Sequence, residues 1–147
     1  MQGQVILVTG GAKRVGAAIC RRLHSAGASI AIHYRSSVQE AQALRDELNA
    51  LRNDSAEIFQ ADLLDLDALP RLTSEVVARF GQLDVLVNNA SSFYATSLAE
   101  IDKNHWDDLI GTNLKAPLFL AQAAAAELGS RQGCIVNIVD IHADRPL

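Results

Sequence analysis

Short apolar runs alternate with longer amphipathic stretches along the whole chain. Five runs, at residues 4–10, 28–34, 56–62, 83–90 and 133–140, are almost continuous in apolar residues. Such runs are typical of strands that are covered on both faces, and their strict alternation with helices is typical of a parallel sheet. The pattern therefore predicts an α/β fold with a doubly wound parallel sheet, in which the runs are the first five strands of a longer fold.

Four helical stretches connect these strands. They cover residues 15–26, 38–51, the segment from Asp65 or Asp67 to Phe80, and residues from about 102 to 128. Gly27 and Gly81 follow the first and third stretches, where a glycine commonly closes a helix. Pro117 lies within the fourth stretch, which we expect to kink or break at that residue.

Right-handed crossovers place the carboxyl ends of parallel strands along one edge, where α/β sheets bind ligands. The residues expected at this edge are Gly10, Tyr34, Asp62, Ala90 and Asp140. The turn after the first strand reads TGGAKRVG and opens a helix. Because glycines let the backbone approach a ligand and helix starts bind phosphate, this context favours a dinucleotide-binding, Rossmann-like domain over a simple tight turn. We assign residues 1–147 to one domain of this kind.

The second strand ends at HYRSS, with no Asp or Glu to hold the ribose hydroxyls of NAD. Arg35 and the serines after it suit the 2′-phosphate of NADP(H), because a guanidinium binds phosphate in a bidentate geometry. The alternative for Arg35 is a solvated loop charge. The missing acid and a second cation, Arg14, favour NADP(H) as the cofactor.

Composition narrows the classes of partner. Of 147 residues, 49% are hydrophobic and 20% charged, as in an ordinary globular domain. A formal charge of -4 with scattered Lys and Arg gives no footprint for nucleic acid. The sequence contains neither a membrane-length apolar stretch nor a signal-peptide pattern, so we expect a cytoplasmic protein with no membrane partner. Cys20 and Cys134 have no metal-ligand spacing, and both are expected to be buried thiols.

Several motifs resemble the short-chain dehydrogenase/reductase superfamily in order and spacing. They are TGGAKRVG, the AD that ends at Asp62, NNAS at residues 88–91 and GTNL around Asn113, and the match spans the whole chain. Arg14 replaces the middle glycine of the usual TGxxxGxG, Ser91 replaces the glycine of NNAG, and Asp140 replaces the usual catalytic Ser. These departures, together with NNASSFY, are similar to the pteridine reductase branch.

The resemblance implies a role for each matching residue. Cofactor contacts are implied for Gly10, Lys13, Arg14, Val15, Gly16, Tyr34, Arg35, Ser36, Asp62, Leu63, Asn89, Ala90 and Ser91. Arg14, Ser91 and Phe93 would bind a pterin, with Phe93 stacked on its ring, although a lone Phe is more commonly a core residue. Asp140 would help to relay a proton, the alternative being a strand-end carboxylate that caps a turn. Asn113 would bend its helix and hold a water in the relay.

The superfamily's Tyr-x-x-x-Lys motif, which follows the position of Asp140, is absent, since Tyr34 and Tyr94 are followed four residues later by Val38 and Leu98. We therefore expect the chain to be the front part of a longer reductase, whether shortened, cleaved or one of two chains, and to be inactive alone. Its last strand would form an uncovered apolar edge. The resemblance also implies a homo-oligomer, a tetramer in relatives, for the complete protein.

The activity that the resemblance implies is reduction of a pterin or dihydrofolate by hydride transfer from NADPH, with the protein orienting the substrate and delivering a proton. One alternative is a short-chain carbonyl reductase that acts on 3-oxoacyl or sugar-like substrates, against which Asp140 and Phe93 argue. Another is a non-catalytic NADP-binding sensor or scaffold, for which the absent Tyr and Lys are the best argument.

Overall fold

The computed structural model describes residues 1–140 and contains a five-stranded parallel sheet. The strands are β1 (Val5–Val8), β2 (Ser29–Tyr34), β3 (Ala56–Gln60), β4 (Val85–Asn88) and β5 (Cys134–Asn137). Their order in the sheet is β3-β2-β1-β4-β5, and every neighbouring pair is parallel. This parallel order confirms the predicted doubly wound α/β fold, and each strand lies inside one of the apolar runs.

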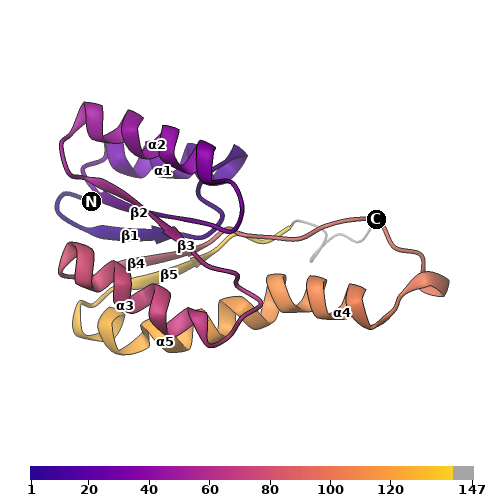
Figure 1. The fold of residues 1–147 in the computed structure, drawn as a ribbon. Coiled ribbons are helices and arrows are strands. Elements are labelled where there is room, and N and C mark those ends of the chain that lie inside the picture. The colour runs from indigo at the N-terminus through magenta and orange to yellow at the C-terminus, as the bar shows by residue number, and fades with distance from the viewer. Residues whose placement is uncertain (141–147) are drawn as a thin grey trace.

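Helices cover both faces of the sheet (Figure 1). They are α1 (Arg14–Ser25), α2 (Val38–Leu51), α3 (Ala68–Phe80), α4 (Lys103–Ile110) and α5 (Ala116–Ser130), with a 3-10 turn η1 (Leu98–Glu100) and a π-helical segment η2 (Gly111–Lys115). α1 and α2 lie on one face, α3 and α5 lie on the other, and α4 projects beyond the carboxyl ends of the strands. Among residues 1–140, no helix combines the length and the apolar composition needed to cross a membrane.

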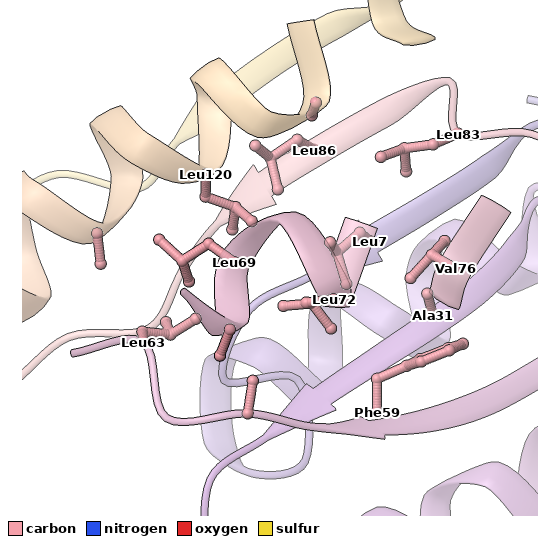
Figure 2. Packing of buried hydrophobic residues seen from close by; sticks show 14 of the residues in the cluster. Leu7, Ala31, Phe59, Leu63, Leu69, Leu72, Val76, Leu83, Leu86 and Leu120 are labelled. Carbon is pink, nitrogen blue, oxygen red and sulfur yellow. The ribbon is translucent and has the colours of Figure 1, made fainter. Parts of the chain in front are cut away.

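The core consists of one apolar layer on each face of the sheet. Because side chains alternate along a strand, Ile6 and Val8 of β1 face α1 and α2, while Leu7 faces α3 and α5. On this second face, Leu72 of α3 packs in the same cluster as Leu120 of α5 (Figure 2). Full burial of each such leucine or isoleucine contributes about 1.5–3 kcal/mol. The two layers hold the strands, and with them the carboxyl edge, in fixed positions.

Gly27 and Gly81 close the first and third helices, as predicted. α1 ends at Ser25 and Gly27 has a φ of 98°, while Gly81 follows α3 directly with a φ of 80°. Both values are left-handed, a conformation that glycine adopts without the clash that a Cβ causes. Asp67 stands at the N-cap of α3, but its side chain makes no capping hydrogen bond.

The fourth predicted helix is irregular, but the irregularity precedes Pro117 instead of lying at it. The regular α4 ends at Ile110, the backbone widens into η2, and α5 begins at Ala116, so that Pro117 falls in its first turn. A proline is tolerated there because its missing N–H has no helical partner to bond. The wider η2 turn contains Asn113, whose carbonyl cannot receive an N–H from Pro117 four residues later.

β5 forms one edge of the sheet and is exposed along its length. Ile135 and Val136 are 40% and 43% exposed, which agrees with the predicted apolar edge. The prediction for the cysteines is wrong in one case. Cys20 is buried, with its Sγ 3.7 Å from the carbonyl oxygen of Gly11, whereas Cys134 is exposed. The reason is that Cys134 lies on a strand that, within the described residues, has a neighbouring strand on one side only.

Candidate functional site

The carboxyl edge of the sheet borders a cavity of about 1120 Å³. It lies where β1 and β4 are neighbours, which is the point at which the strand order reverses and the chain leaves toward opposite faces. Open parallel sheets bind ligands at such a point. The predicted site residues that line the cavity are Gly10, Lys13, Arg14, Val15, Gly16, Arg35, Asp62, Leu63, Asn89, Ala90, Ser91, Asn113 and Asp140. Tyr34, Ser36 and Phe93 were predicted for the site but do not line this cavity.

The turn after β1 brings bare backbone segments into contact. Gly10 has a φ of 60°, and a Cβ on it would lie 3.1 Å from the Cα of Ala90. A Cβ on Gly16, in the first turn of α1, would lie 2.1 Å from the carbonyl oxygen of Gly10 and 2.7 Å from the Nδ2 of Asn89. No side chain fits at Gly16, and one at Gly10 would be strained. The result is a cradle of backbone at the start of α1, which fits the close approach of a pyrophosphate.

Thr9 and Asn89 fasten this turn to the end of β4. The Thr9 hydroxyl accepts hydrogen bonds from the backbone N–H of Asn89 at 2.9 Å and of Ala90 at 3.0 Å, and donates to the carbonyl of Val87 at 3.3 Å. In return, Nδ2 of Asn89 donates to the carbonyls of Thr9 and Gly10 at 2.9 and 3.2 Å. Sequence reasoning missed Thr9, although a Thr that directly follows a buried strand at the ligand edge was the available signal.

Two cations stand at the entrance of α1. Arg14 is the first residue of the helix and has a φ of 49°, a left-handed conformation that costs a residue with a Cβ about 1–2 kcal/mol. Strain of this kind persists only where the surrounding structure holds the residue in place, and it is frequent at ligand-binding sites. Lys13, just before it, forms an ion pair with Glu40 of α2, with 2.7 Å between Nζ and Oε1. The hydrogen bond that the Lys13 ammonium donates, together with its charge, lowers the pKa of Glu40. Both cations border the cavity and can face an anionic ligand.

The residues predicted for the adenosine side lie at the ends of β2 and β3. Arg35 and Asp62 are exposed at the cavity, and Leu63 is a buried part of its wall. Tyr34 is 8% exposed and packs with small residues of α2 and of the turn before α1, which explains why it lies behind the cavity surface. Ser36 follows Arg35 on the exposed loop before α2.

His33 is a buried wall residue that sequence reasoning missed. The backbone N–H of Gly10 donates to its Nδ1 at 3.1 Å, and its Nε2 lies 3.1 Å from the carbonyl oxygen of Ala61. Burial lowers the pKa of His33 to about 4, so the ring is neutral at neutral pH. The signal was a lone histidine in an apolar strand one residue before its end.

Asn113 holds the segment that follows β4. Its Oδ1 accepts from the backbone N–H of Ser92 at 3.1 Å and its Nδ2 donates to the carbonyl of Ser92 at 2.8 Å. The Ser92 hydroxyl also donates to Asp108 of α4 at 3.2 Å. Burial and then a hydrogen bond to Asp108 raise the pKa of Tyr94. These contacts join η2 and α4 to the segment after β4, whose Ser92 lines the cavity.

The structure treats Phe93 and Asp140, the two residues predicted to act on the substrate, differently. Phe93 is 84% exposed on the segment between β4 and η1. Asp140 lies three residues beyond the end of β5 at Asn137, so the strand is shorter than predicted, but Asp140 lines the cavity. Their predicted contacts with a pterin stay predictions.

The cavity is suited to an extended, phosphate-bearing organic ligand. It offers a backbone cradle, the cations Lys13, Arg14 and Arg35, and neutral amide and hydroxyl groups. Within residues 1–140, no three His, Cys, Asp or Glu side chains are grouped so as to hold a metal ion.

A family model described as short chain dehydrogenase matches residues 4–147. A 3-oxoacyl-[acyl-carrier-protein] reductase of Staphylococcus aureus is 38% identical over 92% of this chain and 55% of its own length. Pteridine reductase 1 of Leishmania tarentolae is 35% identical over 97% of this chain and 63% of its own length. The chain therefore spans little more than half the length of the curated relatives it matches.

Solved structures show the same arrangement. A short chain dehydrogenase from Burkholderia cenocepacia in complex with NADP is 40% identical and superposes with a TM-score of 0.94, covering 99% of this chain and 59% of that one. A blue fluorescent protein from a metagenomic library, in complex with NADPH, is 38% identical with a TM-score of 0.91, covering 98% and 58%.

Proposed function

Because the chain belongs to the short-chain dehydrogenase family, we propose that the full-length protein uses NADPH to reduce a pterin or dihydrofolate. NADPH, when bound, supplies the hydride that adds to an electron-poor C=N bond. The residues of this chain bind and orient the reactants and take part in delivering a proton to nitrogen. The observation that carries the proposal is that Arg14, Ser91 and Asp140, three departures from the usual family pattern, line one cavity.

The choice of NADP(H) rests on the wall of the cavity. The cradle at Gly10 and Gly16 suits a pyrophosphate, because both residues line the cavity at the start of α1 and neither has a side chain to cover the backbone there. Arg35 supplies positive charge directly after β2, a position where an Asp or Glu would bond ribose hydroxyls and repel a 2′-phosphate. The NADP and NADPH bound in the two similar structures support this choice.

The choice of a pterin rests on Arg14, Ser91 and Phe93. Arg14 and Ser91 flank the cradle, so one guanidinium and one hydroxyl can contact both a cofactor phosphate and a polar heterocycle. The ring of Phe93 does not line the cavity, but it is exposed and can stack on a flat ligand that extends beyond the lining. The likeness to the Leishmania pteridine reductase supports the same substrate class.

Proton delivery is the role proposed for Asp140, with Asn113 as a residue that shapes the region around it. A carboxyl group at the cavity can pass a proton toward a ring nitrogen if a donor lies within hydrogen-bond reach. The side chain of Asn113 is bonded to the backbone of Ser92, so the contribution of Asn113 to a relay would come through its main chain and the wide η2 turn.

A second candidate is a carbonyl reductase that acts on a 3-oxoacyl thioester. It is favoured by the Staphylococcus aureus reductase, which is 38% identical to this chain, compared with 35% for the pteridine reductase. The two candidates differ at Asp140, since a Ser is usual there in the superfamily.

The full-length protein is to be mixed with NADPH and, separately, with dihydrobiopterin, dihydrofolate and a 3-oxoacyl thioester, and NADPH oxidation is to be followed. The proposal expects turnover of a pterin or folate. Turnover of the thioester alone would establish the second candidate. Binding of NADPH without turnover of any of them would indicate a sensor. As a matched variant, Asp140→Ser is expected to lower kcat for the pterin and to leave the Kd for NADPH unchanged.

A further inference from the structure

We propose that His33 is a positioning residue for the dinucleotide, because its ring fixes the phosphate-binding turn against the strand end beside the adenosine site. The inference rests on the proposed binding of NADP(H). His33 itself makes its two hydrogen bonds to backbone groups, so its effect on the cofactor would be exerted through Gly10 and Ala61.

The ring of His33 joins three separate segments. It projects from β2 and is 2% exposed. Nδ1 receives the N–H of Gly10, which lies just beyond β1, and Nε2 contacts the carbonyl of Ala61, just beyond β3, each at 3.1 Å. One side chain thus fixes the carboxyl ends of both strands that neighbour its own.

These contacts define the tautomer of the ring. The backbone N–H of Gly10 can only donate, so Nδ1 must be the unprotonated acceptor. The carbonyl of Ala61 can only accept, so Nε2 must carry the hydrogen and donate it. A neutral imidazole satisfies both partners with no donor or acceptor left over, which an imidazolium cannot do.

The two backbone groups that His33 holds adjoin the two halves of the proposed cofactor site. The N–H that His33 holds and the carbonyl that packs against Gly16 belong to the same residue, Gly10, on which a Gly16 Cβ would approach the carbonyl oxygen to 2.1 Å, so a shift of Gly10 moves the wall of the cradle. Ala61 directly precedes Asp62 and Leu63, which line the cavity on the adenosine side. His33 therefore sets the spacing between the pyrophosphate and adenosine contacts, and errors of about 1 Å in such spacing weaken function strongly.

Two variants of His33, to Asn and to Gln, distinguish the positioning role from a purely structural role, because the two roles rank them in opposite order for NADPH binding. The amide of Asn places its oxygen where Nδ1 stands, so His33→Asn keeps an acceptor for Gly10 but does not reach Ala61. His33→Gln reaches Ala61 but places carbon where Nδ1 stands, which leaves the buried N–H of Gly10 without its acceptor. Gln is closer to His in size, so packing alone would favour Gln, whereas the positioning role favours Asn.

The test compares the Kd for NADPH and the free energy of unfolding of the full-length protein with those of both variants. We expect His33→Gln to weaken NADPH binding about tenfold, because the turn at Gly10, without an acceptor for its N–H, no longer keeps its place relative to the adenosine contacts. We expect His33→Asn to weaken it less than about threefold, although Asn leaves the larger cavity. Equal losses, or losses that follow the order of stability, would overturn the proposal.

A control and an independent readout keep the outcomes distinct. Among the described residues, His24 is the other buried histidine. Its Nε2 lies 2.7 Å from the hydroxyl of Ser55, and it does not line the cavity. His24→Gln is expected to lower stability without changing the Kd for NADPH. Amide hydrogen exchange at Gly10 should be faster in His33→Gln than in His33→Asn, with or without cofactor. If the wild type bound no NADPH, the proposed function would fail, while this exchange would still report whether His33 holds Gly10.

Discussion

The parallel sheet differs between its amino edge, where the strands begin, and its carboxyl edge, where the strands end. At the amino edge, side chains close over the strand ends: Asp84 accepts from the N–H of Val5 at 2.7 Å, from Arg131 at 2.9 Å and from Gln82 at 2.6 Å. At the carboxyl edge, backbone meets backbone, and Gly10 and Gly16 leave no space for a side chain at their closest approach. The first edge is closed and the second is open to a cavity.

This difference separates the parts that stabilise the protein from those that can bind a ligand. At the amino edge, polar groups bond to other protein groups, as in the case of Asp84, which accepts hydrogen bonds from three donors. At the carboxyl edge, Thr9 and His33 satisfy the inner backbone groups and leave the outer surface of the turn facing the cavity. We expect changes at the amino edge to affect stability alone, and changes at the carboxyl edge to affect the binding of NADPH.

The largest expected effect is that of Gly16→Ala. Its Cβ would stand 2.1 Å from the carbonyl oxygen of Gly10, so the turn or α1 must move. We expect NADPH binding to fall by more than about a hundredfold and stability to fall by about 3 kcal/mol, measured by titration calorimetry and urea unfolding.

Gly81→Ala is the matched variant on the amino side. Gly81 has a φ of 80°, and no atom lies within 4 Å of the place that a methyl group would take, so only backbone strain opposes the change. We expect a loss of about 1 kcal/mol and an unchanged Kd for NADPH. A Gly81 variant that lost NADPH binding would contradict the separation of the two edges.

The second prediction concerns the stability of the protein as the pH falls. Burial lowers the pKa of His33 from 6.5 to about 4, against smaller opposing effects of the bond to Ala61 and the charge of Asp62. The unfolded protein therefore binds this proton at a higher pH than the folded protein, and stability is lost as the pH falls from about 6.5 to 4. The loss should reach about 3 kcal/mol.

Urea unfolding at a series of pH values checks this effect. His33→Asn should flatten the curve between pH 6.5 and 4. Part of the slope will remain, because burial also lowers the pKa of His24 at the opposite edge. An unchanged curve in the Asn variant would show that His33 is not the group that titrates.

The third prediction tests the amino edge with Asp84→Ala. Burial raises the pKa of Asp84, but the hydrogen bonds from Val5, Arg131 and Gln82 lower it by more. The pKa of Asp84 therefore lies below its ordinary value. Removal of the carboxylate leaves the buried N–H of Val5 without a partner and should cost about 2 kcal/mol.

The contribution of Asp84 should have the opposite pH range to that of His33. It is present above the unfolded pKa of about 3.9 and is lost only as the pH falls through the lower folded pKa. The difference between wild type and Asp84→Ala should therefore be constant from pH 7 to about 5 and shrink below about 4. The Kd for NADPH should not change, and an altered Kd would mean that the two edges are coupled.

The fourth prediction tests the charge of Arg35 at the carboxyl edge, separately from the shape of the backbone cradle. Arg35 is exposed at the cavity, so Arg35→Ala should leave stability unchanged. NADPH binding should weaken about tenfold through loss of a charge-assisted contact with the 2′-phosphate, while NADH binding should change little. Equal losses for the two cofactors, measured by fluorescence titration, would refute a contact with the phosphate.

The sequence predicted what depends on local pattern. Apolar runs located all five strands because a strand buried on both faces must be apolar throughout. Gly27 and Gly81 marked helix ends because a left-handed residue is a local requirement. The glycine turn marked the site because its spacing within one βαβ unit is itself the signal.

What the sequence did not predict depends on partners that are distant along the chain. Thr9 bonds to Asn89, 80 residues away, and His33 bonds to Ala61, 28 residues away. Pro117 gave the wrong position for the helix irregularity, and only the family resemblance implied a bend at Asn113, whose bonds to Ser92 are tertiary contacts. Exposure of Cys134 follows from the place of β5 at the edge of the described sheet, a consequence of the predicted uncovered strand that the expectation of a buried thiol did not take into account.

The smallest expected effect is that of Arg14→Gly, which should raise the stability of the fold and weaken the binding of the substrate. Arg14 has a φ of 49°, so Arg14→Gly removes the steric cost of a left-handed Cβ and should stabilise the fold by up to about 1 kcal/mol, reduced by the greater freedom of glycine in the unfolded state. The same change removes a cation from the cavity wall and should raise the KM for the pterin more than the Kd for NADPH, whose cradle is backbone. Arg14→Lys is the control, because it keeps the charge and the strain, loses the planar guanidinium, and should show no gain in stability. A glycine variant that is more stable and binds pterin as well as the wild type would show that the strain at Arg14 serves no purpose at the carboxyl edge.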